Sequence, residues 1–330
     1  MAETINIGDI AVKISKDIFK HFLWEAHSKR DDNFECSNSE HKGDGGTSKS
    51  THPGDVVFIY RDPYLGKNIY LHTDLKSYAK DSLTSTALRK AFKSLCMTID
   101  CARNSSKWRE KYSVDNAEPH EVRGLLFMHN HDNGYDKPFY EVIDKIDLFA
   151  LPISPGAILH YFGPRDIQRL YNIANDMLRL KAENELPKEY TFYYPDLVMT
   201  RRQGDVWQQP ATIEALTSPY LIIKHDSVED CNKGYLIYYN APAKDSEEFE
   251  YFLDSLSRYQ MLESGENIRI RVTREDAPND LKSIFHLAKK RYVKAWGFDP
   301  ARELILNKIE IDRIASVTST YNPGDLGWRE

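Results

Sequence analysis

Hydrophobic positions follow two different periods along the first 180 residues of the chain. Where they recur every three to four residues they indicate an amphipathic helix, and where β-branched and aromatic residues form short apolar runs they indicate a strand. This pattern predicts helices at residues 15–29, 82–99 and 166–180, and strands at residues 55–60, 68–76, 122–128 and 146–153. Alternating helices and strands of this kind are typical of an α/β fold.

A second group of elements follows a polar turn near Gly204. The pattern there predicts strands at residues 220–224, 235–239 and 267–272, and helices at residues 246–262 and 279–296. A chain of 330 residues also exceeds what one hydrophobic core usually organises. We therefore predict two domains, residues 1–205 and residues 206–330, the second being an α+β accessory or partner-binding domain.

Polar residues dominate the segment from residue 30 to residue 52, which is rich in Asp, Ser, Gly and His. This composition predicts a mobile loop. Such loops often carry function, because a rigid scaffold holds their ends in place.

Three charged residues fall on the two strands that follow this loop. Asp74 and Lys76 are two positions apart, so their side chains leave the same face of the strand. Asp55 opens the preceding strand, and the Pro and Gly of the RDPYLGK connection predict a hairpin that folds Asp55 back towards Asp74. The pattern therefore predicts that two carboxylates and one amine converge.

Metal-assisted hydrolysis of a phosphodiester uses a set of this kind. Mg²⁺ prefers oxygen ligands and keeps several waters, so Asp55, Asp74 and the Leu75 carbonyl are expected to hold it, with Mn²⁺ as a substitute. Beside the metal, the Lys76 ammonium would orient or help deprotonate the attacking water and offset negative charge on the phosphate.

The Pro53-Gly54-Asp55 and Asp74-Leu75-Lys76 segments, between a first helix and a later one, resemble the PD-(D/E)XK nuclease superfamily over about residues 10–130. Gly54 departs from the family pattern, which places Pro directly before Asp. The resemblance implies a restriction-endonuclease-like core of helix, mixed sheet and helix, with activity on DNA. It also implies that Glu25, in the predicted first helix, is the additional acidic ligand of many members.

Composition and charge narrow the class of protein further. The apolar fraction of 41 % and the charged fraction of 28 % are typical of a globular protein, and no apolar run is long enough to span a bilayer. We therefore expect a cytoplasmic protein. Its four cysteines show no CxxC spacing, so we expect them to be reduced and structural.

Positive charge is concentrated near the motif, although the whole chain carries a formal charge of −6. Residues 76–123 contain ten Lys and Arg against six Asp and Glu. We predict that Lys80, together with Arg89, Lys90 and Lys93 on the outer face of the helix at residues 82–99, contacts the phosphates of DNA.

Two other functions fit fewer residues. His129 and His131, at the end of an apolar strand, have a spacing that could share a transition metal. Alternatively, the chain is a non-catalytic nucleic-acid-binding or scaffolding subunit that uses only its basic helices.

The resemblance also suggests partners. By analogy with effector subunits of prokaryotic restriction and antiphage systems, we expect the chain to act with a second protein subunit. Because cleavage of both DNA strands usually needs two such sites, a homo-oligomer is expected as well.

Overall fold

The computed structural model describes residues 7–43, 45–115, 117–195, 197, 208–229, 231–262, 265–297, 299–317 and 321. The chain forms two compact units, the first comprising Met1–Tyr171 and Thr318–Glu330, the second Asn172–Val317. Each unit contains one mixed sheet, so the predicted α/β class is confirmed. Within the described residues, no helix has the length and apolar character needed to cross a membrane.

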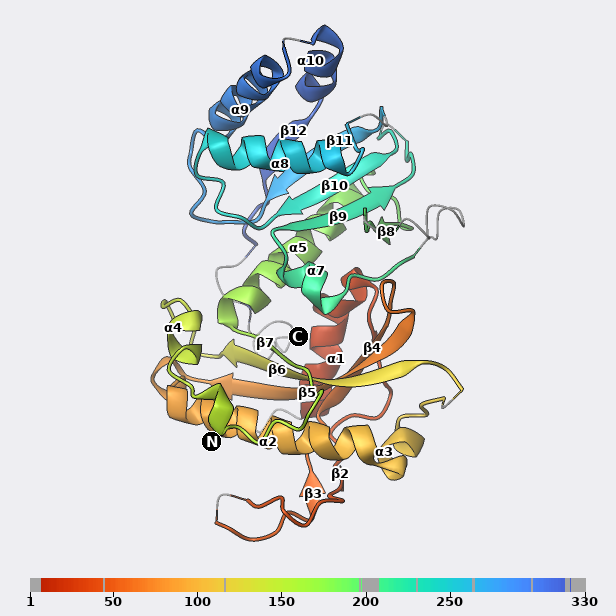
Figure 1. The fold of residues 1–330 in the computed structure, drawn as a ribbon, viewed down its shortest axis with the longest axis vertical. Helices are drawn as coiled ribbons and strands as arrows, with labels where there is room; N and C mark the ends of the chain where they lie inside the picture. Colours follow the sequence, from red (N-terminus) through yellow and green to blue (C-terminus); the bar gives the residue numbers. More distant parts are fainter. Residues whose placement is uncertain are drawn as a thin grey trace. The chain divides into compact units, whose positions relative to one another are not determined.

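The sheet of the first unit has the order β1-β4-β5-β6-β7 (Figure 1). Its strands are β1 (Glu25–Ala26), β4 (Val56–Asp62), β5 (Lys67–Tyr78), β6 (His120–Asn130) and β7 (Leu159–Phe162). The first three strands pair antiparallel, and β5, β6 and β7 pair parallel. The two longest strands, β5 and β6, lie at its centre.

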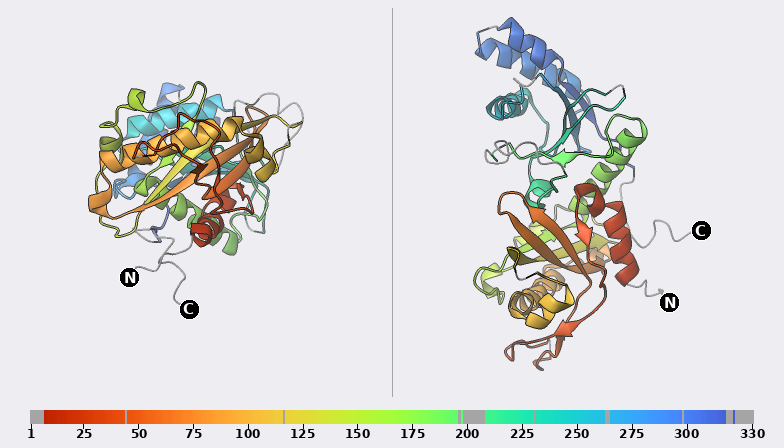
Figure 2. Two further views of the ribbon diagram at one scale, coloured as in Figure 1. Left: turned by 90° about the horizontal axis from the view of Figure 1, so that it is seen from below. Right: turned by 90° about the vertical axis from the view of Figure 1, so that its right-hand side faces the viewer.

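Helices cover both faces of this sheet, with α1 (Ile7–Asp17) on one face and α2 (Ser85–Asn104) on the other (Figure 2). Side chains alternate between the two faces of a strand. On the first face, Phe19 of the 3-10 helix η1 (Phe19–Phe22) packs against Phe58 and Phe127. On the other face, Leu126 and Met128 belong to the same apolar core as the buried face of α2.

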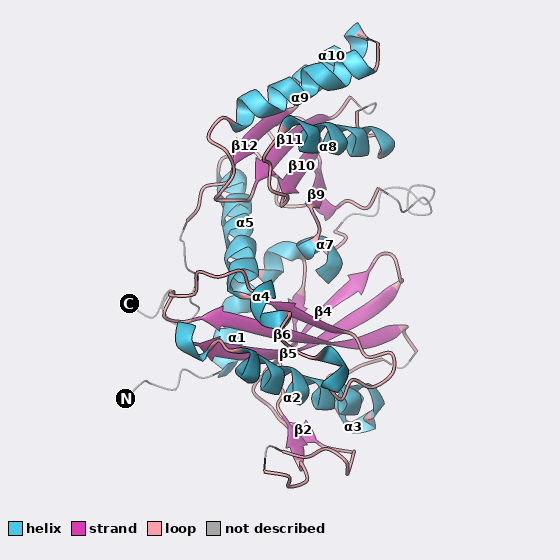
Figure 3. Cartoon of the chain, turned by 60° about the vertical axis from the view of Figure 1, so that its left-hand side comes forward, coloured by secondary structure: helices cyan, strands magenta, loops and turns pink. Residues whose placement is uncertain are grey.

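The segment predicted as a mobile loop contains a two-stranded sheet instead. Strand β2 (Phe34–Glu35) pairs antiparallel with β3 (Thr51–His52), and a further bridge joins Lys42 to Ser48. This β2–β3 hairpin lies beside α2 (Figure 3), and the Lys49 ammonium donates to Ser94 of that helix.

Two elements of the first unit were predicted wrongly. The predicted helix at residues 15–29 is absent, because α1 ends at Asp17 and Leu23 adopts a left-handed conformation with φ 62° after η1. Trp24 then stacks on Phe19 and on Tyr60 of β4, which draws the chain into β1.

The predicted strand at residues 146–153 is also absent. This stretch follows α4 (Tyr140–Ile143) and contains the 3-10 helix η3 (Leu148–Ala150). The Asp147 side chain caps η3 by accepting from the Phe149 N–H. Leu148 and Phe149 are exposed, so the apolar run does not mark a buried strand.

The second unit contains a sheet of order β12-β11-β10-β9-β8. Its strands are β8 (Thr191–Phe192), β9 (Tyr220–His225), β10 (Gly234–Tyr239), β11 (Asn267–Val272) and β12 (Glu310–Arg313). One face forms a core with α8 (Ser246–Arg258), α9 (Leu281–Ala295) and α10 (Pro300–Asn307). Short helix α7 (Ile213–Thr217) precedes β9, and the strands and long helices predicted for this region are present.

The opposite face of this sheet contacts α5 (Pro164–Ala182) through a buried ion pair. Asp176 Oδ1 and Oδ2 accept from Arg271, and Oδ2 also accepts from the Tyr238 hydroxyl at 3.0 Å. The units divide within α5, between Tyr171 and Asn172, rather than at residue 205, because β8 already belongs to the second sheet. Residue 205 itself lies outside the described residues.

Gly54 sets the path of the chain into β4. The backbone N–H groups of Asp31 and Asp32 donate to the carbonyls of Asp55 and Gly54, so the two segments lie backbone to backbone. A Cβ at Gly54 would lie 2.4 Å from the Asp32 carbonyl oxygen. The glycine that departs from the family pattern is therefore required by this close approach.

Replacing Gly54 with Ala is expected to lower the free energy of unfolding by about 1–3 kcal/mol, because the new methyl group must displace backbone. Denaturant unfolding followed by circular dichroism measures the change. Gly45→Ala is the matched control, since nothing lies within 4 Å of its Cβ position. Equal stability of the two variants would contradict this account of Gly54.

Candidate active site

The register of the β4–β5 hairpin brings Asp55 and Asp74 together. Val56 pairs with Thr73, so the same register continued by one residue sets Asp55 directly opposite Asp74. Residues opposite each other across an antiparallel pair share a face and have Cβ atoms about 4.5–5.5 Å apart. The predicted convergence of the two carboxylates follows from this register.

Both carboxylates are buried, with exposed fractions of 5 % for Asp55 and 3 % for Asp74. Asp55 Oδ2 accepts from the Leu75 N–H at 2.7 Å, where the backbone pairing of β4 with β5 has ended. Asp74 Oδ1 accepts from the Lys76 ammonium. The acid and the amine of the Asp74-Leu75-Lys76 segment therefore contact each other on one face of β5.

One oxygen of this set is left without a partner. Asp74 Oδ2 is buried and has no hydrogen-bond donor among the described residues. A buried carboxylate oxygen without a donor is costly unless a cation or a water completes it. The carboxylate oxygens of Asp55 and Asp74 are therefore suitable ligands for a divalent cation.

The Leu75 carbonyl is placed to join these ligands. The N–H and C=O of one residue leave a strand on the same side, and the Leu75 N–H points to Asp55. Its carbonyl therefore points to the side of the Asp55 carboxylate. Two carboxylates and one carbonyl form an all-oxygen set, which suits Mg²⁺ or Mn²⁺.

The charges of the site are strongly coupled. Burial, and then the neighbouring Asp74 carboxylate, raise the pKa of Asp55 to about 7. Burial alone would lower the pKa of Lys76, but the carboxylates of Asp74 and Asp55 outweigh it, and that pKa is raised. Lys76 is thus an ammonium at neutral pH, and a cation bound beside Asp55 would favour the ionised form of its carboxylate.

A buried histidine holds the segment before Asp55, and sequence reasoning missed it. His72, on the same face of β5 as Asp74, is 1 % exposed. Its Nε2 donates to the Pro53 carbonyl at 2.8 Å, and its Nδ1 accepts from Trp108 Nε1 of α3 (Ser106–Lys111) at 3.3 Å. The strand alternation could have placed His72 on this face, but nothing in the sequence indicated its bond to Pro53.

Glu25 is not brought to the two aspartates. It lies in strand β1 rather than in a helix, is exposed, and pairs with Ile59 of β4. Ile59 is four residues beyond Asp55, about 13 Å at the rise of an antiparallel strand. The placement of Glu25 in the first helix is therefore wrong, because that helix ends eight residues earlier, at Asp17.

The predicted basic residues lie where β5 leads into α2. Lys80 belongs to the 3-10 helix η2 (Lys80–Ser82), and its ammonium lies 3.4 Å from Asp136 Oδ1. Arg89, Lys90 and Lys93 are exposed residues in the first half of α2. Strand β5 ends at Tyr78 and α2 begins at Ser85, so the first half of α2 follows the end of β5 that carries Lys76.

The alternative site at His129 and His131 has structural partners. His131 Nδ1 lies 2.9 Å from Ser77 Oγ, and the Asn130 amide donates to the Tyr78 carbonyl and to Asp132. These contacts join the ends of β5 and β6. In the part of the chain that is described, neither histidine joins a group of three or more metal-binding side chains.

A comparison with known protein families matches the part of the chain that contains this site. The family model described as the GAPS4 protein PD-(D/E)XK nuclease domain matches residues 1–165, which include the whole β4–β5 hairpin and α2. No curated protein and no solved structure matches the chain.

The buried pair of carboxylates predicts an unusual pH dependence of stability in metal-free protein. Because the pKa of Asp55 is about 7 in the folded protein and ordinarily 3.8, its protonated form stabilises the fold at low pH. That stability is lost as the pH rises from about 4 to about 7.

Asp55→Asn removes the titrating carboxyl group. At pH 8 we expect the free energy of unfolding of this variant to exceed that of the wild type by on the order of 2 kcal/mol, and at pH 3 we expect the two to be equal. Denaturant unfolding in EDTA measures this. Added Mg²⁺ should stabilise the wild type and not the variant. Asp81→Asn, at an exposed position, is the control. If the wild type were as stable as Asp55→Asn at pH 8, burial beside the Asp74 carboxylate would not destabilise the ionised form of Asp55.

Proposed function

The chain belongs to the family of GAPS4 PD-(D/E)XK nuclease domains, and from this premise we propose that it hydrolyses DNA phosphodiester bonds at Asp55, Asp74 and Lys76. Its first unit is a restriction-endonuclease-like core, and the second unit is an additional α/β domain. The observation that carries the proposal is the buried Asp55–Asp74 pair, with one Asp74 oxygen lacking a donor and Lys76 beside it.

Each group has a distinct task in the proposed reaction. When bound, a divalent cation polarises a phosphate oxygen and makes a bound water more acidic. Asp55, Asp74 and the Leu75 carbonyl would hold this cation, with Mg²⁺ as the expected ion and Mn²⁺ as its substitute. Because the pKa of Lys76 is raised, its ammonium orients the attacking water and offsets charge on the phosphate, rather than removing a proton.

DNA is the proposed substrate, with the exposed face of α2 as its phosphate-binding surface. Arg89, Lys90 and Lys93 lie on that face, and Lys80 precedes it in the chain. Contacts with phosphates position a nucleic acid without reading its sequence. These residues would thus hold the backbone while the metal ligands act on one phosphate.

The biological setting is proposed from the family. We infer that the nuclease acts in the cytoplasm in antiphage defence, with a second copy of the chain or a separate subunit. Two sites are needed to cut two strands in one encounter, which favours an assembly. The second unit would then serve as the accessory or partner-binding domain.

Loss of either charged partner at the site is expected to abolish cleavage. Asp74→Ala and Lys76→Ala should each lower the rate of DNA cleavage by about 100-fold or more, because a metal ligand or the charge beside it is lost. Gel analysis of linear, circular and single-stranded DNA with and without Mg²⁺ measures this, and circular dichroism checks the fold.

Lys67→Ala is the matched control, since Lys67 also lies on β5 and forms a partly exposed ion pair with Glu121. Full cleavage by Asp74→Ala, or by wild type in excess EDTA, would refute the nuclease assignment. DNA binding that is unchanged by Mg²⁺ and by Asp74→Ala, without cleavage, would favour a non-catalytic binding subunit.

If the exposed face of α2 binds phosphates, its basic residues determine part of the salt dependence of DNA binding. Arg89→Gln combined with Lys93→Gln should weaken DNA binding equally for all sequences and lower the slope of log K against log salt by about 2. Fluorescence anisotropy at several salt concentrations measures it. The double variant Lys16→Gln and Lys20→Gln removes two exposed charges elsewhere in the first unit and should keep the slope. An unaltered slope in the α2 variant would exclude this surface.

A further inference from the structure

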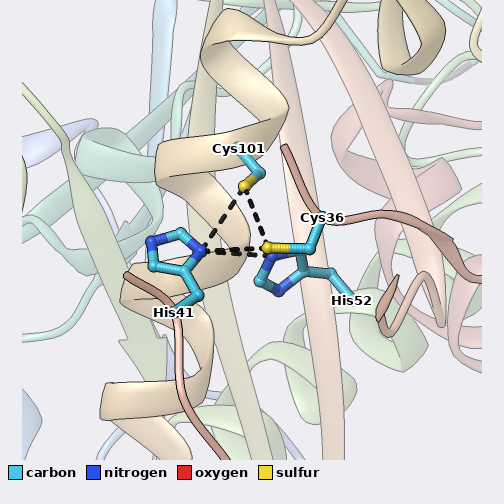
Figure 4. Close-up of side chains that lie close together, drawn as sticks. All are labelled: Cys36, His41, His52 and Cys101. Carbon is cyan, nitrogen blue, oxygen red and sulfur yellow. Dashed lines mark hydrogen bonds between the residues drawn. The ribbon is translucent and has the colours of Figure 1, made fainter. Parts of the chain in front are cut away.

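Four side chains from distant parts of the sequence meet beside the β2–β3 hairpin. Cys36 follows β2, His41 lies in the hairpin connection, His52 ends β3, and Cys101 lies on α2. Figure 4 shows both sulfur atoms and both imidazoles turned towards one another. One ligand atom from each residue lies within 4.8 Å of all the others.

The separations between these atoms are those of a tetrahedron of metal ligands. Zn–S bonds of about 2.3 Å and Zn–N bonds of about 2.0–2.1 Å place two sulfurs about 3.8 Å apart, sulfur and nitrogen about 3.6 Å apart, and two nitrogens about 3.3 Å apart. The Cys36 and Cys101 sulfurs are 3.8 Å apart, and His41 Nδ1 lies 3.4 Å and 3.5 Å from them. His41 Nδ1 and His52 Nε2 are 3.4 Å apart.

The other nitrogen of each imidazole has a hydrogen-bond acceptor. His41 Nε2 lies 3.2 Å from Asp100 Oδ2, and His52 Nδ1 lies 3.3 Å from Thr98 Oγ1. Thr98 donates its own hydroxyl proton to the Ser94 carbonyl, so its oxygen accepts from His52. With the proton of each ring on this outer nitrogen, a lone pair faces the centre, which is the form in which histidine binds a metal.

A cation bound by these four residues would be held away from water, because His52 is fully buried and Cys101 is 1 % exposed. The close approach of the two sulfurs also needs an explanation. A disulfide does not account for it, because its sulfurs lie about 2.05 Å apart, whereas Cys36 and Cys101 are free and 3.8 Å apart.

We propose that Cys36, His41, His52 and Cys101 bind one Zn²⁺ as a closed structural site. Two sulfurs and two nitrogens in a tetrahedron favour Zn²⁺ over Mg²⁺ or Ca²⁺, which prefer oxygen ligands. All four positions are filled by protein, so no position is open for a substrate, in contrast to the all-oxygen set at Asp55 and Asp74.

The site fastens the β2–β3 hairpin to α2 and fixes the start of β4. Three ligands come from the hairpin and one from the helix, so the metal joins two segments that are otherwise far apart in sequence. His52 directly precedes Pro53, whose carbonyl accepts from His72, and Asp55 follows two residues later. The Zn²⁺ is therefore a positioning element for Asp55, and its presence does not rest on the proposed nuclease activity.

Metal content is the direct test. The full chain purified in reducing buffer and passed through a desalting column should contain about one zinc per chain by inductively coupled plasma mass spectrometry. Cys36→Ser and Cys101→Ser should lose it. Cys96→Ser, which changes another buried cysteine of α2, and Cys231→Ser are the matched controls and should keep it.

If a variant of one of the four ligands does not fold, two further measurements still test the site. One uses a variant outside the ligand set, and the other replaces Zn²⁺ with Co²⁺. Asp100→Asn removes the charge behind His41 and should weaken zinc binding roughly 10- to 100-fold in a chelator competition. Wild type reconstituted with Co²⁺ should show the intense visible bands of a tetrahedral site with thiolate ligands.

Three results would overturn the proposal: wild type without zinc and without the Co²⁺ bands, zinc retained in Cys101→Ser, or a Cys36–Cys101 disulfide in the purified chain. The test is independent of cleavage. Asp74→Ala should keep its zinc while losing activity, so failure of the zinc site and failure of the nuclease assignment are distinguishable.

Discussion

The burial of two like charges side by side is the constraint on which the first unit depends. Asp55 and Asp74 face each other because the hairpin register leaves no other arrangement, and both are nearly inaccessible to water. Lys76 neutralises one of them, and the Leu75 N–H stabilises the other. What remains is an excess of negative charge that favours a small hard cation. The repulsion between the two ionised carboxylates would thus strengthen the binding of a cation between them.

Two carboxylates stay this close only if the backbone around them is rigid. Three interactions hold the segment before Asp55 in place. The close backbone contact at Gly54 fixes the path of the chain, and the His72 ring ties the Pro53 carbonyl to Trp108. The proposed Zn²⁺ holds His52 on the other side of Pro53. Three different interactions therefore converge on residues 52–54, directly before Asp55, where a small displacement would separate the carboxylates.

The β4–β5 hairpin could be predicted from the sequence, because alternation along a strand and a turn signal are local properties. Asp74 and Lys76 share a face for that reason alone. Glu25 was placed in a helix because its apolar neighbours have helical spacing, yet stacking of Trp24 on Tyr60 outweighs that pattern. The Cys36, His41, His52 and Cys101 cluster was missed because its spacing matches no short motif, and a ligand on α2 is identifiable only once the hairpin is seen against that helix. The partnership of His72 with Pro53 was hidden for the same reason.

Both sheets are bounded by very short outer strands. In the first sheet the outermost strands have two and four residues, around inner strands of up to 12, and in the second the outermost strands again have two and four. A short border offers few unpaired backbone groups to a neighbouring molecule, which is a recognised protection against aggregation. Strands of two to four residues are poor templates for pairing, so extension of either sheet at these strands is not the expected route by which two copies of the chain associate.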